Sequence, residues 1–119
     1  MSVTTKIPQE QLADYFAAFT RRFLLDESPE CVDIEVLEPD RGDHSSPIAQ
    51  CAHLMGITYE RRTGRLEFEL DSADHRIENP AEVWVLEEPD GFLSALEVVY
   101  DDGTREVVSI KRVGVREGR

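Results

Sequence analysis

The chain has 119 residues, of which 40% are hydrophobic, and its 25 acidic residues against 13 basic ones give a net charge of −12. This length accommodates one modest core, so we predict a single domain over residues 1–119. The negative charge argues against nucleic acid and anionic membrane surfaces as partners, because binding to either requires a basic face.

An amphipathic helix is predicted first, over about residues 8–25. Pro8 suits the first helical position, where its missing amide hydrogen costs no hydrogen bond. Apolar side chains then recur at intervals of three and four, which gathers them on one helix face. These side chains are Leu12, Tyr15, Phe16, Phe19 and Phe23. The polar stretch that leads to Pro29 is expected to end the helix.

About six strands are predicted after the helix, because apolar and polar residues alternate there or apolar runs lie between turn signals. Their ranges are about 31–37, 48–60, 65–71, 82–87, 93–101 and 105–112. Gly56 indicates a bulge or bend, and Asp101-Asp102-Gly103 indicates a hairpin turn. Residues 38–47 are predicted to form a polar loop and residues 113–119 a frayed tail.

These elements favour an α+β fold in which the N-terminal helix packs on a curled, mostly antiparallel sheet. Hairpin connections dominate, and no βαβ crossover is visible in the sequence. Residues 105–119 carry five basic side chains, whereas residues 77–104 carry eight acidic ones and none basic. We therefore expect the last strand to pair its basic side chains with acidic ones on its neighbours.

The two cysteines, Cys31 and Cys51, are predicted to be free thiols in a reducing cytoplasm, since no signal peptide or membrane span is visible. Cys51-x-His53, together with Cys31 and His75, offers the atoms of a zinc site, but the spacing matches no usual zinc motif. Buried, inert thiols are the alternative. We predict no metal and no cofactor, and neither cysteine sits where a thiol would be activated.

No catalytic residue is predicted. The chain contains no glycine-rich phosphate loop, no nucleophile elbow and no Cys-x-x-Cys pair. Adjacent acids such as Glu87-Glu88 and Asp101-Asp102 point to opposite faces of a strand or lie in a turn, which favours solvated surface charges over an acid–base pair. These observations argue against an enzyme.

Four side chains are candidates for ligand binding: His75, Trp84, Glu87 and Tyr100. An aromatic wall with a histidine and an acid is typical of a small-molecule pocket, and these residues could converge at one end of a curled sheet. The alternative is structural: Trp84, the only tryptophan, would anchor the core, and His75 would stabilise a turn.

Several short motifs resemble a family of small uncharacterised bacterial proteins of unknown function. They are Ile7-Pro8, Leu54-Met55-Gly56-Ile57, His75-x-Ile77-x-x-Pro80-x-x-Val83-Trp84, Leu96-Glu97-Val98 and Asp102-Gly103-Thr104. The resemblance spans nearly the whole chain and implies one domain with this order of elements. It implies no activity, cofactor or catalytic residue. Cys51 and His53 lie outside its pattern, and residues 27–31 depart from it.

Three functions stay open at this point. The first is a non-enzymatic binding or protein-interaction module, whose partner is an unknown protein or a second copy in a homodimer. The second is a small-ligand-binding domain with a pocket between helix and sheet. The third is an enzyme of unrecognised class.

Overall fold

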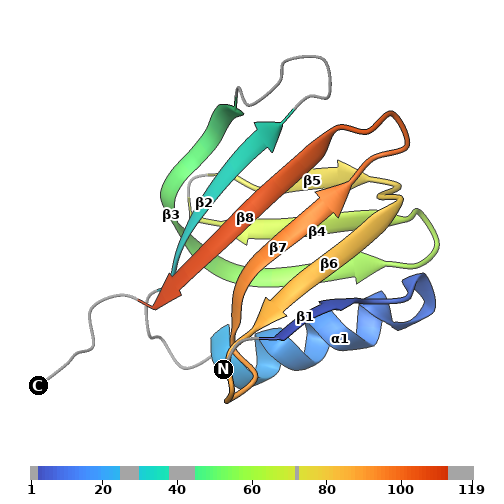
Figure 1. The fold of residues 1–119 in the computed structure, drawn as a ribbon. Helices are drawn as coiled ribbons and strands as arrows, with labels where there is room; N and C mark the ends of the chain where they lie inside the picture. The colour runs from blue at the N-terminus through green and yellow to red at the C-terminus, as the bar shows by residue number, and fades with distance from the viewer. Residues whose placement is uncertain (1–2, 25–29, 38–44, 72, 113–119) are drawn as a thin grey trace, which may run out of the picture.

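The computed structural model describes residues 3–24, 30–37, 45–71 and 73–112. They form one helical segment and eight strands (Figure 1). The strands are β1 (Val3–Lys6), β2 (Glu30–Leu37), β3 (Ser45–Glu60), β4 (Arg65–Leu70), β5 (His75–Glu78), β6 (Glu82–Glu87), β7 (Leu93–Val99) and β8 (Arg105–Arg112). The predicted combination of an N-terminal helix and an antiparallel sheet is confirmed. The predicted tail at residues 113–119 lies outside the described residues.

All eight strands belong to one antiparallel sheet with the order β1-β6-β7-β8-β2-β3-β4-β5. The expected number of about six strands was therefore wrong. The two additional strands, β1 and β5, have four residues each and lie at the two edges. Such short segments carry little periodicity of their own, and their pairing with β6 and β4 makes them strands.

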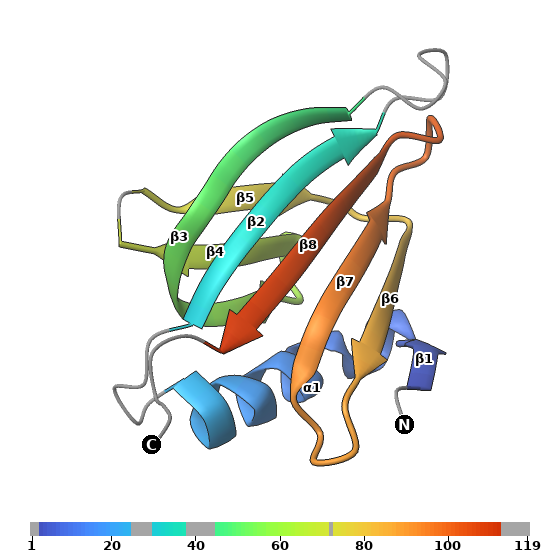
Figure 2. The same ribbon diagram turned by 60° about the vertical axis from the view of Figure 1, so that its left-hand side comes forward.

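The helical segment consists of a 3-10 turn η1 (Gln9–Gln11), the helix α1 (Leu12–Phe19) and a π-helical turn η2 (Thr20–Leu24). The predicted helix reached residue 25, which lies outside the described residues. Leu12, Phe16 and Phe19 are buried, as their spacing indicates, while Tyr15 and Phe23 are half-buried and pack against the core. The segment lies on the inner side of the sheet (Figure 2).

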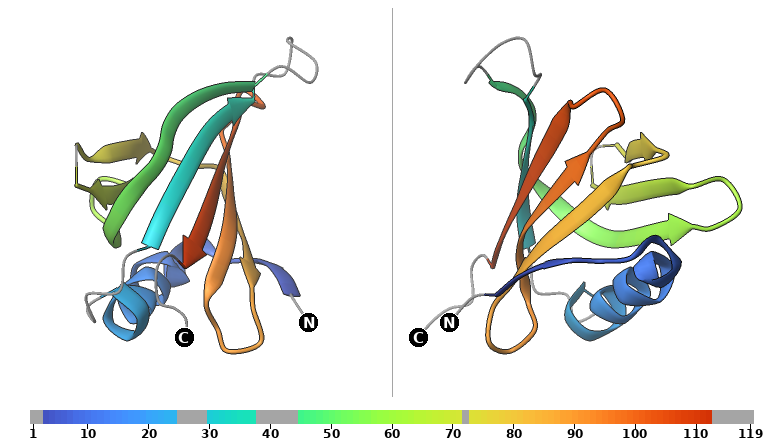
Figure 3. Two further views of the ribbon diagram at one scale, coloured as in Figure 1. Left: turned by 90° about the vertical axis from the view of Figure 1, so that its left-hand side faces the viewer. Right: turned by 45° about the vertical axis from the view of Figure 1, so that its right-hand side comes forward.

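The sheet curls because β3 is long and changes partners along its length. Its first part pairs with β2 as far as His53, and its second part pairs with β4 from Leu54 onward. The helical segment then covers the edge of β3 that β2 has left. The Thr20 hydroxyl donates to the carbonyl of Ile57 at 3.0 Å and accepts from its amide at 3.0 Å. The result is an open sheet bent around the helix (Figure 3).

The bend lies at Gly56, where the sequence indicates a bulge, and the β3–β4 register shifts between Leu54 and Gly56. A Cβ at this position would come within 3.0 Å of Oε1 of Glu69 and 3.7 Å of Cγ2 of Thr20. The absence of a side chain therefore allows β4 and the helical segment to approach β3 from both sides.

Cys31 is disulfide-bonded, so the prediction that its thiol is free was wrong. It is a buried residue of β2 and lies opposite Lys111 of β8 and His53 of β3. The side chain of Cys51 lies outside the described residues.

Candidate functional site

The four candidate side chains do not converge. His75 and Tyr100 meet at a common partner, Glu106, whereas Trp84 and Glu87 lie elsewhere. Trp84 points to the face of β6 opposite the buried Val83 and Val85, and its indole N–H donates to Glu82 at 2.9 Å. Glu87 accepts a hydrogen bond from the hydroxyl of Tyr15 on α1. The predicted constellation is thus divided among three places.

Glu106 is the one charged side chain that is buried among the described residues, with 5% exposure. Its Oε1 lies 2.6 Å from Nε2 of His75, and its Oε2 accepts a hydrogen bond from the hydroxyl of Tyr100. His75 comes from edge strand β5 and Glu106 from β8, so their contact spans the curled sheet from one part to the other. We call Tyr100, Glu106 and His75 the buried triad.

Sequence reasoning missed Glu106, although the sequence carries a signal for it. Glu106, Val108 and Ile110 are alternate residues of β8, so Glu106 points to the same inward face as the other two, which are buried. Its cross-strand neighbours are Val36 and Val98. An acid at an inward position of a strand requires a hydrogen-bonding partner. The sequence does not identify His75 as that partner, because the curl of the whole sheet brings β5 close to β8.

Burial, together with a hydrogen bond to a carboxylate, raises the pKa of two tyrosine phenols. For Tyr100, burial raises the pKa well above the ordinary value of about 10, and the hydrogen bond to Glu106 and its negative charge add to the effect. For Tyr15, burial and then the hydrogen bond to Glu87 act in the same direction. Both hydroxyls therefore stay protonated and remain donors well above neutral pH.

These shifts predict a loss of stability as pH rises above about 10. In the unfolded chain both tyrosines ionise near their ordinary pKa, whereas the folded protein holds their protons to a higher pH. Their contribution is thus complete below the unfolded pKa and is lost as pH rises through the folded pKa. Urea denaturation between about pH 8 and pH 11 measures the decline. A variant with both Tyr15→Phe and Tyr100→Phe should decline less steeply, and parallel declines would contradict the assignment.

The outer face of sheet strands β1, β6, β7, β8 and β2 is the side turned away from the helix (Figure 2). It carries a shallow hollow of about 260 Å³. The outward side chains that line it are mainly apolar: Leu37, Trp84, Leu86, Ala95 and Val107, with Thr4, Glu97 and Arg105. We call this set the outer hollow.

Ion pairs surround the outer hollow. Arg105 of β8 pairs with Glu97 of β7 at 2.8 Å, and Lys111 of β8 pairs with Asp33 of β2 at 3.6 Å. The expected pairing of the basic last strand with acidic neighbours is therefore confirmed. A third pair joins Lys6 and Glu82 at 3.9 Å. Among the residues that the structure describes, this face carries three basic side chains and four acidic ones, the fourth acid being Glu35.

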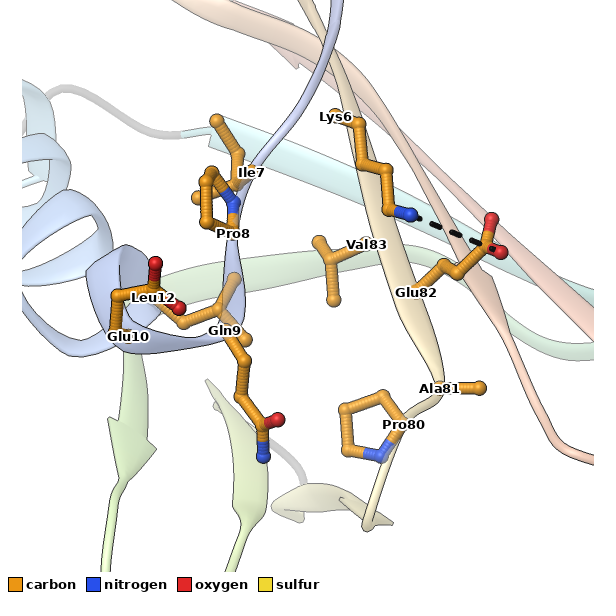
Figure 4. Close-up of a pocket in the computed structure, with 10 residues that line it drawn as sticks. All are labelled: Lys6, Ile7, Pro8, Gln9, Glu10, Leu12, Pro80, Ala81, Glu82 and Val83. Carbon is orange, nitrogen blue, oxygen red and sulfur yellow. Dashed lines mark ion pairs between the residues drawn. The ribbon is translucent and has the colours of Figure 1, made fainter.

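Two further hollows lie between the helical segment and the sheet, one near each end of the segment. The first has about 390 Å³ and lies where the chain enters η1 (Figure 4). Its walls are mainly apolar: Ile7, Pro8, Leu12, Pro80 and Val83. Its cation, Lys6, is paired with Glu82, and both side chains point away from the apolar walls in Figure 4.

The second hollow has about 270 Å³ and lies at the other end, between η2 and the turn that joins β6 to β7. We call it the η2 hollow. It is lined by Tyr15, Ala18, Phe19, Arg22, Phe23, Glu87 and Gly91. An arginine and a carboxylate therefore face one small space, and Glu87, a sequence-predicted candidate, is one of its walls.

Among the described residues, no three His, Cys, Asp or Glu side chains are grouped so that they could hold a metal ion. His53 is exposed on β3, and Cys31 is engaged in its disulfide. No helix in the described part of the chain is long and apolar enough to span a membrane.

Comparison with known proteins identifies relatives without an assigned activity. A model described as a family of unknown function (DUF5335) matches residues 3–115. An uncharacterised protein of Aquifex aeolicus (strain VF5) is 32% identical over 109 residues, which cover 91% of this chain and 92% of the relative. No solved structure matches this chain. The resemblance to a small uncharacterised family is thereby confirmed.

Proposed function

We propose that this chain, which belongs to the family of unknown function DUF5335, is a non-enzymatic interaction module that binds a second copy of itself through the outer hollow. The observation that carries the proposal is an apolar, tryptophan-containing face on a strongly acidic protein. The partly exposed Trp84 lies in this face, and tryptophan is enriched at the centres of protein interfaces.

Charge indicates the outer face as the surface through which a second copy would bind. Two copies of a chain with net charge −12 repel one another over most of their surfaces. Repulsion is weaker at the outer face, because its three described basic side chains nearly balance its four described acidic ones, and each of these bases is already paired. Two copies that met through this face would bring together neutral, apolar surfaces with a rim of ion pairs, in the isologous manner of a two-fold dimer.

The oligomeric state tests this proposal. Size-exclusion chromatography with light scattering should give about twice the 13.5 kDa mass of one chain. Ala95→Lys, which places a charge inside the outer hollow, should give a monomer because an unpaired ammonium group would be desolvated in the interface. This substitution also makes the chain less negative, so a loss of the dimer would not reflect added repulsion between copies.

Met55→Lys is the matched control. Met55 is an exposed apolar residue of β3, with 52% exposure, and it does not line the outer hollow. The same change of charge there should leave the dimer intact. A wild-type protein that stays monomeric at about millimolar concentration, or equal loss of the dimer in both variants, would refute the proposal.

Two other sequence-based predictions, an enzyme of unrecognised class and a cytoplasmic location, remain proposals. The buried triad supplies an acid, a base and a phenol, which is the feature that an enzyme of unrecognised class would use, but all of its groups are engaged with one another. The predicted cytoplasmic location stays a prediction, and the disulfide at Cys31 weighs against it because disulfides are rare in reducing compartments.

A further inference from the structure

We propose that the η2 hollow binds a free amino acid or a zwitterion of similar size. Arg22 would take the ligand's carboxylate and Glu87 its ammonium group. This site lies on the helix side of the sheet, so it is separate from the outer face and independent of the proposed dimer. Two opposite charges line this hollow, and they form no ion pair with each other among those found for the described residues.

The guanidinium of Arg22 is held in place but has no anionic partner among the described residues. The group lies over the ring of Phe23, 4.8 Å from its centroid, and this cation–π contact orients it. None of the ion pairs found among the described residues involves Arg22. The guanidinium carries five N–H donors and can bind both oxygens of a carboxylate in a bidentate arrangement, so an anionic group is the expected ligand.

The chain reaches Arg22 closely because residue 91 is glycine. A Cβ on Gly91 would lie 3.0 Å from Nη1 of Arg22, and the φ of +94° is one that side-chain-bearing residues rarely adopt. The turn is closed by a hydrogen bond of 2.8 Å from the amide of Gly91 to the carbonyl of Glu88. The far wall of the hollow is thus a defined turn next to the guanidinium.

Glu87 presents the opposite charge. Its Oε2 accepts the hydrogen bond from Tyr15, which fixes the carboxylate, and no ion pair with a basic side chain is found for it in the described part of the chain. Its other oxygen, Oε1, has no hydrogen-bond donor among the described residues. A carboxylate oriented by one donor and facing a hollow is suited to an ammonium group.

The size and walls of the η2 hollow set the ligand class. Its volume of about 270 Å³ is suited to a small solute. Phe19 and Phe23, whose rings lie 5.3 Å apart, form an apolar wall on which a ligand side chain could rest. In the larger hollow near η1, which Glu10 also lines, the cation Lys6 is already paired with Glu82.

Thermal shift with the twenty common amino acids, each at about 10 mM, tests the proposal, because a ligand that binds only the folded state raises the melting temperature. We expect at least one amino acid to do so. For that amino acid, the N-acetyl derivative lacks the ammonium group and the amide derivative lacks the carboxylate. If the site binds both charged groups, calorimetry should show that each derivative binds about tenfold more weakly than the amino acid itself.

Arg22→Gln should weaken binding by about tenfold or more, whereas Arg21→Gln is the matched control. Arg21 is the exposed neighbouring arginine on η2 and does not line the hollow. Tyr15→Phe should weaken binding less, because it frees Glu87 without removing it. The proposal fails if no amino acid shifts the melting temperature, or if Arg22→Gln and Arg21→Gln bind equally well.

Discussion

Phe16→Ala is expected to lower the free energy of unfolding by about 3–5 kcal/mol. Phe16 has 0% exposure and belongs to the α1 face that the curled sheet covers. The lost ring would leave a cavity between helix and sheet, because packed interiors relax only in part around a deletion. Urea denaturation monitored by circular dichroism gives the difference in free energy directly.

Two comparisons make this experiment specific. Ala17 is the exposed neighbour on the same helix, so Ala17→Ser should change the free energy of unfolding by less than about 1 kcal/mol. Trp84→Ala should cost clearly less than Phe16→Ala, because Trp84 lies half-buried on the outer face. Equal losses in the free energy of unfolding for Phe16→Ala and Trp84→Ala would mean that Trp84 is a core anchor, as the sequence suggested.

The parts of the fold that the sequence predicts are those in which periodicity and burial agree. The spacing of Leu12, Phe16 and Phe19 indicates the buried helix face, and alternation in β4 and β8 indicates which residues point inward. The edge strands β1 and β5 escape this reasoning, because four residues with no strong alternation become a strand only when a neighbour is available. Their existence depends on pairing with β6 and β4.

The candidate sites were harder to predict, for a related reason. His75 and Tyr100 were identified by residue type, but their common partner Glu106 comes from a strand that the sequence alone does not place beside β5. Glu87 was also identified, yet its neighbour Arg22 belongs to the end of the helix. Residue type therefore predicts which side chains carry chemistry, while the curl of the sheet decides which of them meet.

Glu106→Ala is the second substitution from which we expect a large effect, a loss of about 2–4 kcal/mol in the free energy of unfolding. The change removes the acceptor that both the Tyr100 hydroxyl and the His75 ring use, and it leaves two polar groups in a mostly buried setting without a partner. It also releases the contact that holds edge strand β5 to β8. Glu106→Gln, which keeps an oxygen acceptor in place, should lose less.

Glu97→Ala is the control for this experiment, since it removes a carboxylate of the same length from the neighbouring strand β7. Glu97 is on the outer face, and its pair with Arg105 at 2.8 Å is partly exposed, so the loss should be below about 1 kcal/mol. A large loss for Glu106→Ala and a small one for Glu97→Ala would assign the difference to burial of the triad. Similar small losses would mean that the desolvation of Glu106 cancels the stabilisation from its two hydrogen bonds. Packing alone would then hold β5 against β8.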